Sequence, residues 1–214
     1  TPLVLSVLPS GSDVGVVEGA GGAVSTSQLT RALAVASAGG AGTAPSHAHG
    51  GVAAAGVRKL VLLNSHGGQV GLMDVVAREL RGHCGLTVFG SNWYQLPLGA
   101  AWDAFGEHEH RFGVHGGDIE TSLMLAIAPH KVRMDEAQHF ASASEDRAAN
   151  FSLLGDGKSA KLGWHMQDYN PEGAAGNAAA ATAAKGTALV NSAGEQLARL
   201  LQELMLLPLT TVCD

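Results

Sequence analysis

Runs of apolar residues alternate with amphipathic stretches along the chain. Leu3–Leu8, Lys59–Leu63 and Leu86–Phe89 are short, largely apolar runs of the kind that form buried strands. Between the last two, Val70–Leu80 places apolar residues at helical spacing, and Gly82 and Gly85 follow as stop signals. Because a strand, a helix and a strand in this order form a βαβ unit, the pattern predicts a three-layer α/β/α fold with a mainly parallel central sheet.

Further helices are predicted on either side of this unit. One lies near residues 25–35, one covers Ile119–Ile127, and a long Ala- and Leu-rich helix covers Asn177–Leu206. Residues 135–175 are polar and show no period, which predicts an irregular segment. Since no repeat or linker divides the sequence, residues 1–214 are interpreted as a single domain.

Composition narrows the class of protein. Hydrophobic residues make up 46% of the chain and charged residues 15%, so a sizeable core can form and disorder throughout is not expected. The net charge of −6 comes without any block of Lys and Arg, which argues against a nucleic-acid partner. No membrane span is expected either, because no apolar run reaches about 18 residues.

Cysteine usage and the N-terminal residues bear on the compartment. Cys84 and Cys213 lie far apart in sequence, so neither a disulfide framework nor a zinc knuckle is predicted. The first residues lack the charged start and the long apolar run of a signal peptide. Both observations favour a cytoplasmic protein.

Two segments place a histidine beside a Gly-Gly pair at the start of a predicted helix. His66 lies in "NSHGG", directly after a predicted strand, and His115 lies in "VHGGDIETS". Asp118 and Glu120 follow His115 within about one helical turn, and a histidine with a carboxylate so close can serve as metal ligand and proton shuttle. An acid in the first turn of a helix can equally compensate the helix dipole. The residues by themselves leave both interpretations open.

These segments resemble a known family. Residues 58–69, "RKLVLLNSHGGQ", are similar to the creatininase-family signature "RRLVLLNGHGGN", and residues 114–135, "VHGGDIETSLMLAIAPHKVRMD", resemble its "HAGEIETSLMLALRPDLVRMD". Further similarity is found in "SNWYQL" at 91–96 and in "GWHMQDYNPEGAAGNAAAATAAKG" at 163–186. The resemblance covers most of the chain from residue 58 onward.

The resemblance implies an α/β sandwich and a two-metal centre, of zinc or manganese, that hydrolyses a C–N bond of a small amide substrate. Carried over by position, His66 and Glu120 match metal ligands of the family, and Asp13 matches its bridging aspartate. His115 matches the histidine that assists the attack. The resemblance further implies a homo-oligomer, such as a hexamer.

The N-terminal part departs from the family pattern. A Glu- and His-bearing segment of the family is absent between Ser12 and Asp13, and a second shortfall lies at 36–52, where His47 and His49 are not assigned to the metal. One interpretation is a homologue that has lost metal ligands and acts as a binding or structural subunit. The other is a sequence from which loop segments of the full-length polypeptide are missing. A direct link from Ser12 to Asp13 would erase the loop between a strand and its helix, which favours the second interpretation.

The substrate is indicated only by class. Creatininase carries Tyr and Glu after the motif histidine and a Trp before the second one, whereas this chain has Gly67, Gly68 and Arg111 at those positions. Without that aromatic enclosure, the Gly-Gly form looks more like the relatives that act on formamides or small peptides than like an enzyme for creatinine.

Other candidate residues are interpreted as structural. Glu107–His110 has a metal-like composition, but in an irregular segment it predicts a solvated loop. Cys84 is expected at a helix C-terminal turn, where no base stands opposite it, so a structural or surface thiol is predicted. Asp168 and Tyr169 are treated as structural as well.

Overall fold

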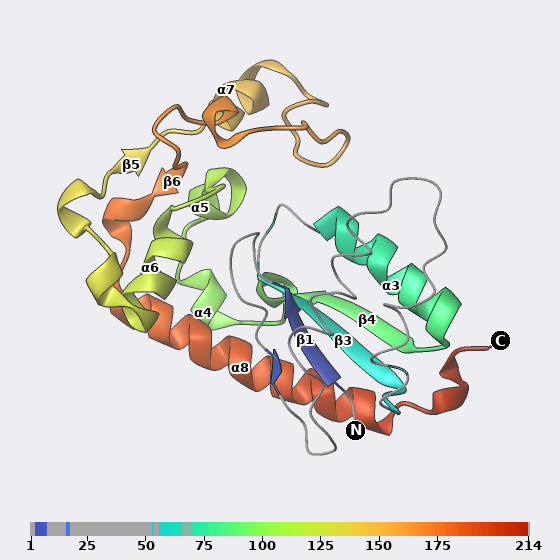
Figure 1. Ribbon diagram of the computed structural model, residues 1–214. Coiled ribbons are helices and arrows are strands. Elements are labelled where there is room, and N and C mark those ends of the chain that lie inside the picture. The colour runs from blue at the N-terminus through green and yellow to red at the C-terminus, as the bar shows by residue number, and fades with distance from the viewer. Residues whose placement is uncertain are drawn as a thin grey trace. The chain divides into compact units, whose positions relative to one another are not determined.

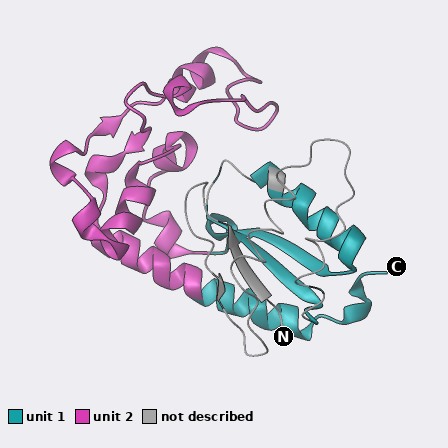
Figure 2. Cartoon of the chain, in the orientation of Figure 1, with its two compact units in different colours: residues 1–97, 195–214 teal, residues 98–194 magenta. Residues whose placement is uncertain are grey.

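The fold is described by a computed structural model over residues 3–7, 16–17, 53, 56–65, 67 and 70–213. The chain divides into two compact units, coloured separately in Figure 2. The first unit comprises residues 1–97 and 195–214, and the second comprises residues 98–194. Helix α8 (Ala183–Leu206) begins in the second unit and ends in the first.

A four-stranded sheet forms the centre of the first unit, in the order β2-β1-β3-β4 (Figure 1). Strands β1 (Leu3–Val7), β3 (Lys59–Asn64) and β4 (Thr87–Asn92) are parallel to one another. Strand β2 (Val16–Val17) pairs with β1 in the antiparallel direction. The predicted α/β fold with a mainly parallel sheet is therefore confirmed.

The continuous apolar run of β3 is explained by contacts on both of its faces. Leu60 and Leu62 are buried in a core cluster with Met73, Val76 and Leu80 of helix α3 (Val70–Cys84) and with Leu86. Val61 points the other way and lines an apolar cavity with Leu200, Leu204 and Leu207, at the C-terminal end of α8. A strand buried on both faces needs no polar alternation, which is why the sequence shows none.

Helix α3 is longer than its apolar period predicts. It continues through Gly82 to Cys84, where the chain turns at Gly85 with a φ of 63°. That left-handed conformation carries little steric penalty for glycine, which makes Gly85 the residue that ends the helix.

The second unit is built from short helices and a small two-stranded sheet. Helix α6 (Asp118–Ile127) matches the predicted helix at these residues. The antiparallel strands are β5 (His139–Phe140) and β6 (Gly176–Asn177). The remaining α-helices of the described residues are α4 (Ala100–Asp103), α5 (Glu107–Phe112) and α7 (Ala143–Asn150). Single 3-10 turns lie at Trp93–Gln95, Pro129–Lys131, Met134–Glu136, Met166–Asp168, Ala178–Ala180 and Leu209–Thr211.

Two element predictions are wrong. Residues 135–175 are not wholly irregular, because α7 forms there behind a capping box: Glu145 Oε1 accepts from Ser142 N at 3.2 Å and Ser142 Oγ accepts from Ser144 N at 3.3 Å. The Ser-x-x-Glu spacing at 142–145 is the sequence pattern that predicts the start of this helix. The long helix starts at Ala183 rather than Asn177, since Gly176 and Asn177 pair with β5 and outweigh the helix propensity of the alanines.

The predicted helix near residues 25–35 lies outside the described residues. Within the described part of the chain, no helix combines the length and the apolar character needed to cross a bilayer.

Candidate active site

His115 is held by backbone pairing with a distant segment of the second unit. Its N–H donates to Ala175 O at 3.2 Å, its carbonyl accepts from Ala175 N at 2.7 Å, and Val114 N also donates to Ala175 O at 2.8 Å. The chain then turns at Gly116, whose φ of 65° suits glycine. This turn leads into α6 and brings the first turn of that helix back towards the His115 ring.

His115 and Glu120 form a hydrogen-bonded pair at this turn. His115 Nδ1 lies 3.1 Å from Glu120 Oε2, and the same oxygen accepts from Gly116 N at 2.6 Å. The hydrogen bond to Glu120 raises the pKa of His115 above its usual value; partial burial lowers this pKa, and the carboxylate charge raises it further. The net shift favours the imidazolium, so His115 keeps its proton to a higher pH than an isolated histidine does.

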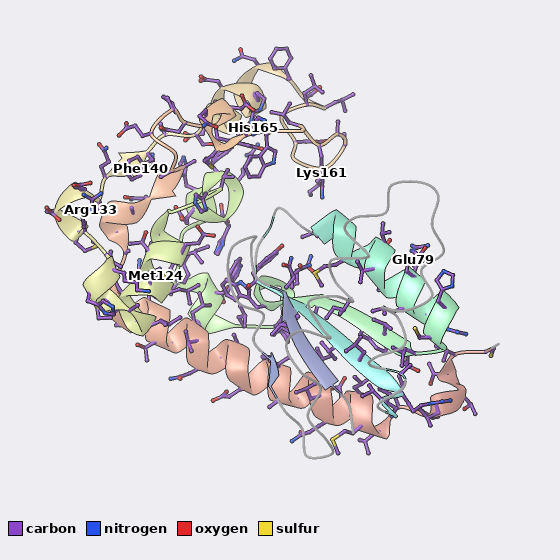
Figure 3. All side chains as sticks on the ribbon, viewed as in Figure 1. Glu79, Met124, Arg133, Phe140, Lys161 and His165 are labelled. Atoms are coloured by element: carbon purple, nitrogen blue, oxygen red, sulfur yellow. The ribbon has the colours of Figure 1, made fainter. Side chains whose placement is uncertain are left out.

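The pair opens onto a cavity of about 400 Å³. Met124, Arg133 and Phe140, labelled in Figure 3, belong to its wall, and Lys131 contributes a second cation. Arg133 donates to Glu136 Oε1, another lining residue, at 2.6 Å. The cavity thus offers an apolar surface, both signs of charge and a histidine with a raised pKa, which are the components of a small-molecule site.

A buried carboxylate fixes the backbone behind the pair. Glu109 is 6% exposed, and its oxygens accept from Asn177 N at 2.9 Å and from Ile119 N at 3.4 Å. A Cβ at Gly176 would lie 3.0 Å from Glu109 Oε1, and one at Gly117 would clash with the same oxygen. The prediction that Glu107–His110 forms a solvated loop is therefore wrong: the segment is helix α5, and it buries the side chain that ties α6 to β6.

Asp118 has a different role from Glu120. It lies 2.5 Å from Lys185 Nζ and accepts from Ser122 Oγ at 3.0 Å, and both carboxylate and ammonium are largely buried. Asp118 therefore ties α6 to α8, and Glu120 is the acid of this helix turn that pairs with His115.

In the first unit, a pair of amides marks the carboxyl ends of two neighbouring strands. Asn64 is fully buried and donates to Asn92 Oδ1 at 2.7 Å, and Asn92 donates to Gln95 Oε1 at 2.6 Å. Asn64 and Asn92 are also register partners of β3 and β4. In the sequence, His66 follows two positions after Asn64. Ligands of α/β proteins bind at such strand ends.

The predicted site residues are only partly described. His115 and Glu120 are brought together, whereas Asp13 and His66 lie outside the described residues, as do His47 and His49. The convergence of Asp13, His66 and Glu120 therefore stays a prediction.

Sequence reasoning missed two residues that support the backbone around the His115–Glu120 pair, Glu109 and Lys185. It also missed the amide pair Asn64–Asn92 of the first unit. Each contact joins residues at least ten positions apart, so no periodicity predicts it. The available signal was the polar character of Asn64 at the end of an otherwise apolar strand and of Lys185 in an Ala-rich stretch.

The residues interpreted as structural have structural contacts. Tyr169 lies under the Arg147 guanidinium, 4.8 Å from its ring centroid, and meets Trp164 edge to face. Asp168 Oδ2 accepts from His165 N at 2.7 Å. Burial raises the pKa of Cys84, at the end of α3, which makes its thiol less nucleophilic at neutral pH.

Comparison with known proteins identifies the family. The sequence model of the Creatininase family, described as creatinine amidohydrolase, matches residues 47–201, more than half of the chain. The chain therefore belongs to the Creatininase family. No curated protein matches the sequence significantly.

Solved structures agree on the fold. A putative creatinine amidohydrolase from Bacteroides fragilis NCTC 9343 is 22% identical, with a TM-score of 0.58 over 84% of this chain and 79% of that chain. A mutant creatininase of Zn–Zn type is 21% identical, with a TM-score of 0.53 over 82% of this chain and 64% of that chain. A creatinine amidohydrolase (creatininase) crystal structure matches with a TM-score of 0.51, at 21% identity, over 82% of this chain and 63% of that chain. The chain thus spans somewhat less than two thirds of these two creatininase chains, and the fold is creatininase-like.

Proposed function

We propose that this protein is a metal-dependent amidohydrolase that cleaves a C–N bond of a small amide: a cyclic amide, a formamide or a peptide-like substrate. The single observation that carries the proposal is the His115–Glu120 pair, which lies in a family motif and borders a cavity of about 400 Å³. Family membership supports the reaction class, because the matching family model is described as creatinine amidohydrolase.

The metal in this proposal is zinc or manganese, held by Asp13, His66 and Glu120. A mixed His and carboxylate donor set suits either ion. The Glu120 side chain is 45% exposed beside the cavity, so an ion can reach its carboxylate, and a similar structure is a creatininase of Zn–Zn type. When bound, such a metal lowers the pKa of a water ligand and polarises the substrate carbonyl.

His115 supplies the proton chemistry. With its pKa raised by Glu120, it is available as an imidazolium that donates a hydrogen bond to the oxyanion or a proton to the departing nitrogen. Glu120, through Nδ1, holds the ring so that Nε2 is the nitrogen left for the substrate. The Gly116 N–H fixes the carboxylate in turn.

The wider architecture belongs to the same proposal. Four further features stay predictions: the single creatininase-like domain, the three-layer sandwich, the cytoplasmic location and the homo-oligomer. A hexamer is one form of that oligomer. The α3 and α8 side chains that meet β3 from opposite faces support the three layers.

A second candidate is a metal-free binding or structural subunit. The departure that favours it is the missing Glu- and His-bearing segment between Ser12 and Asp13. Metal content of the purified protein, together with its intact mass against the mass of these 214 residues, separates the two candidates.

The proposed function is tested by two histidine variants and an amide panel. His115→Ala should cut turnover by about a hundred- to ten-thousand-fold, the usual worth of general acid–base help, and should retain the metal. His66→Ala should lose activity together with the metal of the catalytic centre. The measurements are metal analysis and hydrolysis rates on cyclic amides, formamides and short peptides.

Two results would contradict parts of this proposal, and each has its own meaning. Release of metal by His115→Ala would make this residue a ligand rather than an acid. A metal-loaded protein that hydrolyses nothing in the panel would favour the binding-subunit candidate.

A further inference from the structure

Three potential metal ligands from separate elements converge on the surface of the second unit. His108 belongs to α5, His139 to β5 and Glu145 to α7, and Figure 1 shows these elements near one another. His108 Nε2 lies 3.1 Å from Glu145 Oε2, and the His108 and His139 ring centroids are 5.5 Å apart. One ligand atom from each residue lies within 4.8 Å of the other two.

We propose that His108, His139 and Glu145 form a zinc site that is separate from the Asp13–His66–Glu120 set. Two imidazole nitrogens and one carboxylate oxygen are a ligand set of Zn²⁺, which then keeps its fourth position for water. The 3.1 Å between His108 Nε2 and Glu145 Oε2 is close to the about 3.3 Å that separates tetrahedral ligands with bonds of about 2.0 Å. The third ligand atom, from His139, lies within 4.8 Å of these two.

The carboxylate is already oriented for this role. Glu145 Oε1 accepts from Ser142 N at 3.2 Å in the capping box of α7, while Oε2 faces His108. The bond that stabilises the helix start therefore also limits the rotation of the carboxylate. A ligand fixed by such a supporting hydrogen bond loses little freedom when a metal binds.

The two histidines are held by a common buried group. His139 is the register partner of Asn177, and Asn177 N donates to Glu109 Oε2 at 2.9 Å. Glu109 is the residue after His108 on α5. One carboxylate thus positions the backbones of both histidines, although they are far apart in sequence.

The site is accessible to an ion from solvent. The His108 side chain is 50% exposed and that of Glu145 is 34% exposed, and His139 is exposed as well. One ion bound there would join α5, β5 and α7 at the surface of the unit. In the absence of zinc, His108 Nε2 and Glu145 Oε2 form a surface hydrogen bond, a contact of small energetic value.

Zinc binding by the full chain tests the proposal. The protein is stripped with a chelator, equilibrated with Zn²⁺ alone, dialysed and analysed for metal. His108→Ala, His139→Ala and Glu145→Gln should each bind one equivalent less than the wild type, and His130→Ala, an exposed histidine of the same unit, should bind the wild-type amount. Circular dichroism in the presence of chelator verifies that each variant is folded.

A second pair of variants, both carrying His66→Ala, distinguishes this site from the proposed catalytic centre. His66→Ala should still bind zinc, and His66→Ala/His139→Ala should lose it, whatever the hydrolytic activity of the protein. Zinc should also raise the melting temperature of His66→Ala but not that of the double variant, because only a folded site binds the ion. Two outcomes would overturn the proposal: equal zinc content in the wild type and all three cluster variants, or complete loss of zinc in His66→Ala. Only the His108–Glu145 hydrogen bond would then remain.

Discussion

At the scale of single residues, His115 and Glu120 show how a short sequence spacing becomes a functional geometry. Five positions separate them, and the turn at Gly116 followed by the first turn of α6 folds the carboxylate back onto the ring. The contact raises the pKa of the histidine. Its chemistry can therefore be probed by changing the acid alone.

Replacing Glu120 by glutamine should move the pKa of His115 downwards. The charged acceptor stabilises the imidazolium, so its loss releases the proton at lower pH. An NMR titration of His115 in the metal-free protein measures the pKa directly.

The matched control for this titration is Glu136→Gln, which alters a carboxylate in the same cavity wall. The raised pKa of His115 also makes the folding stability depend on pH. The stability that it contributes is fully present below about pH 6.5 and is lost as the pH rises through the pKa of the folded state. A His115 pKa unchanged in Glu120→Gln would contradict the assigned contact.

Glu109 is the residue on which the local backbone depends most. Its carboxylate accepts from backbone N–H groups of α6 and β6, and an amide in its place would turn an N–H₂ group towards these donors. Glu109→Gln should lower the free energy of unfolding by about 1–3 kcal/mol, the cost of unsatisfied buried groups. Chemical denaturation measures it.

The exposed Glu107, two residues earlier on the same helix, provides the control: Glu107→Gln should leave the unfolding free energy nearly unchanged. Equal stability of the two variants would argue against the supporting role of Glu109.

At the scale of elements, α6 and α8 approach each other closely. A Cβ at Gly186 would clash with the carbonyl of Ser122, so glycine is required for this approach. The Asp118–Lys185 ion pair spans the same two helices, and Lys185 Nζ lies 5.1 Å from the Phe105 ring centroid. An ammonium so placed is shielded from water on one side.

Asp118→Ala should destabilise the protein by about 3–5 kcal/mol, because it leaves the ammonium of Lys185 in a largely buried place without its partner. Asp118→Ala/Lys185→Met should recover part of the loss, since the uncompensated charge is removed. Thermal or denaturant unfolding of both variants provides the comparison.

The control for this pair is the exposed Arg78–Asp74 contact on α3, where Asp74→Ala should change little. A double variant less stable than Asp118→Ala would show that the two residues contribute through separate contacts.

At the scale of the whole molecule, the C-terminal end carries exposed apolar side chains. Leu206 is 84% exposed, Met205 60% and Leu209 52%, which is unusual for a surface that meets only water. These residues are the structural basis for the expected homo-oligomer.

Leu206→Glu should therefore shift the protein towards smaller species in light scattering at micromolar concentration. A buried charge at a subunit contact is costly, whereas the same charge on an exposed residue is not. Gln202→Glu, on the same helix, is the matched control and should leave the mass unchanged. A wild-type monomer at this concentration would contradict the assembly prediction.

Periodicity and motifs in the sequence were sufficient for the larger features. The apolar runs of β1, β3 and β4 and the helical spacing of α3 and α6 predicted a mainly parallel α/β fold, since burial selects residue types position by position. Motif residues led to the family, and the His115–Glu120 pair follows from a spacing that one turn and one helix start convert into contact.

Contacts between residues that are distant in sequence were determined only by the tertiary structure. Glu109 with Asn177, Asp118 with Lys185, and His108 with His139 and Glu145 are joined by segments that fold back from far along the chain. A local pattern reports whether a residue is apolar or charged, but not which distant N–H group, ammonium or imidazole it will meet. That information exists only once strand pairing and helix contacts have brought the segments together, because each of these bonds depends on distances of a few ångströms.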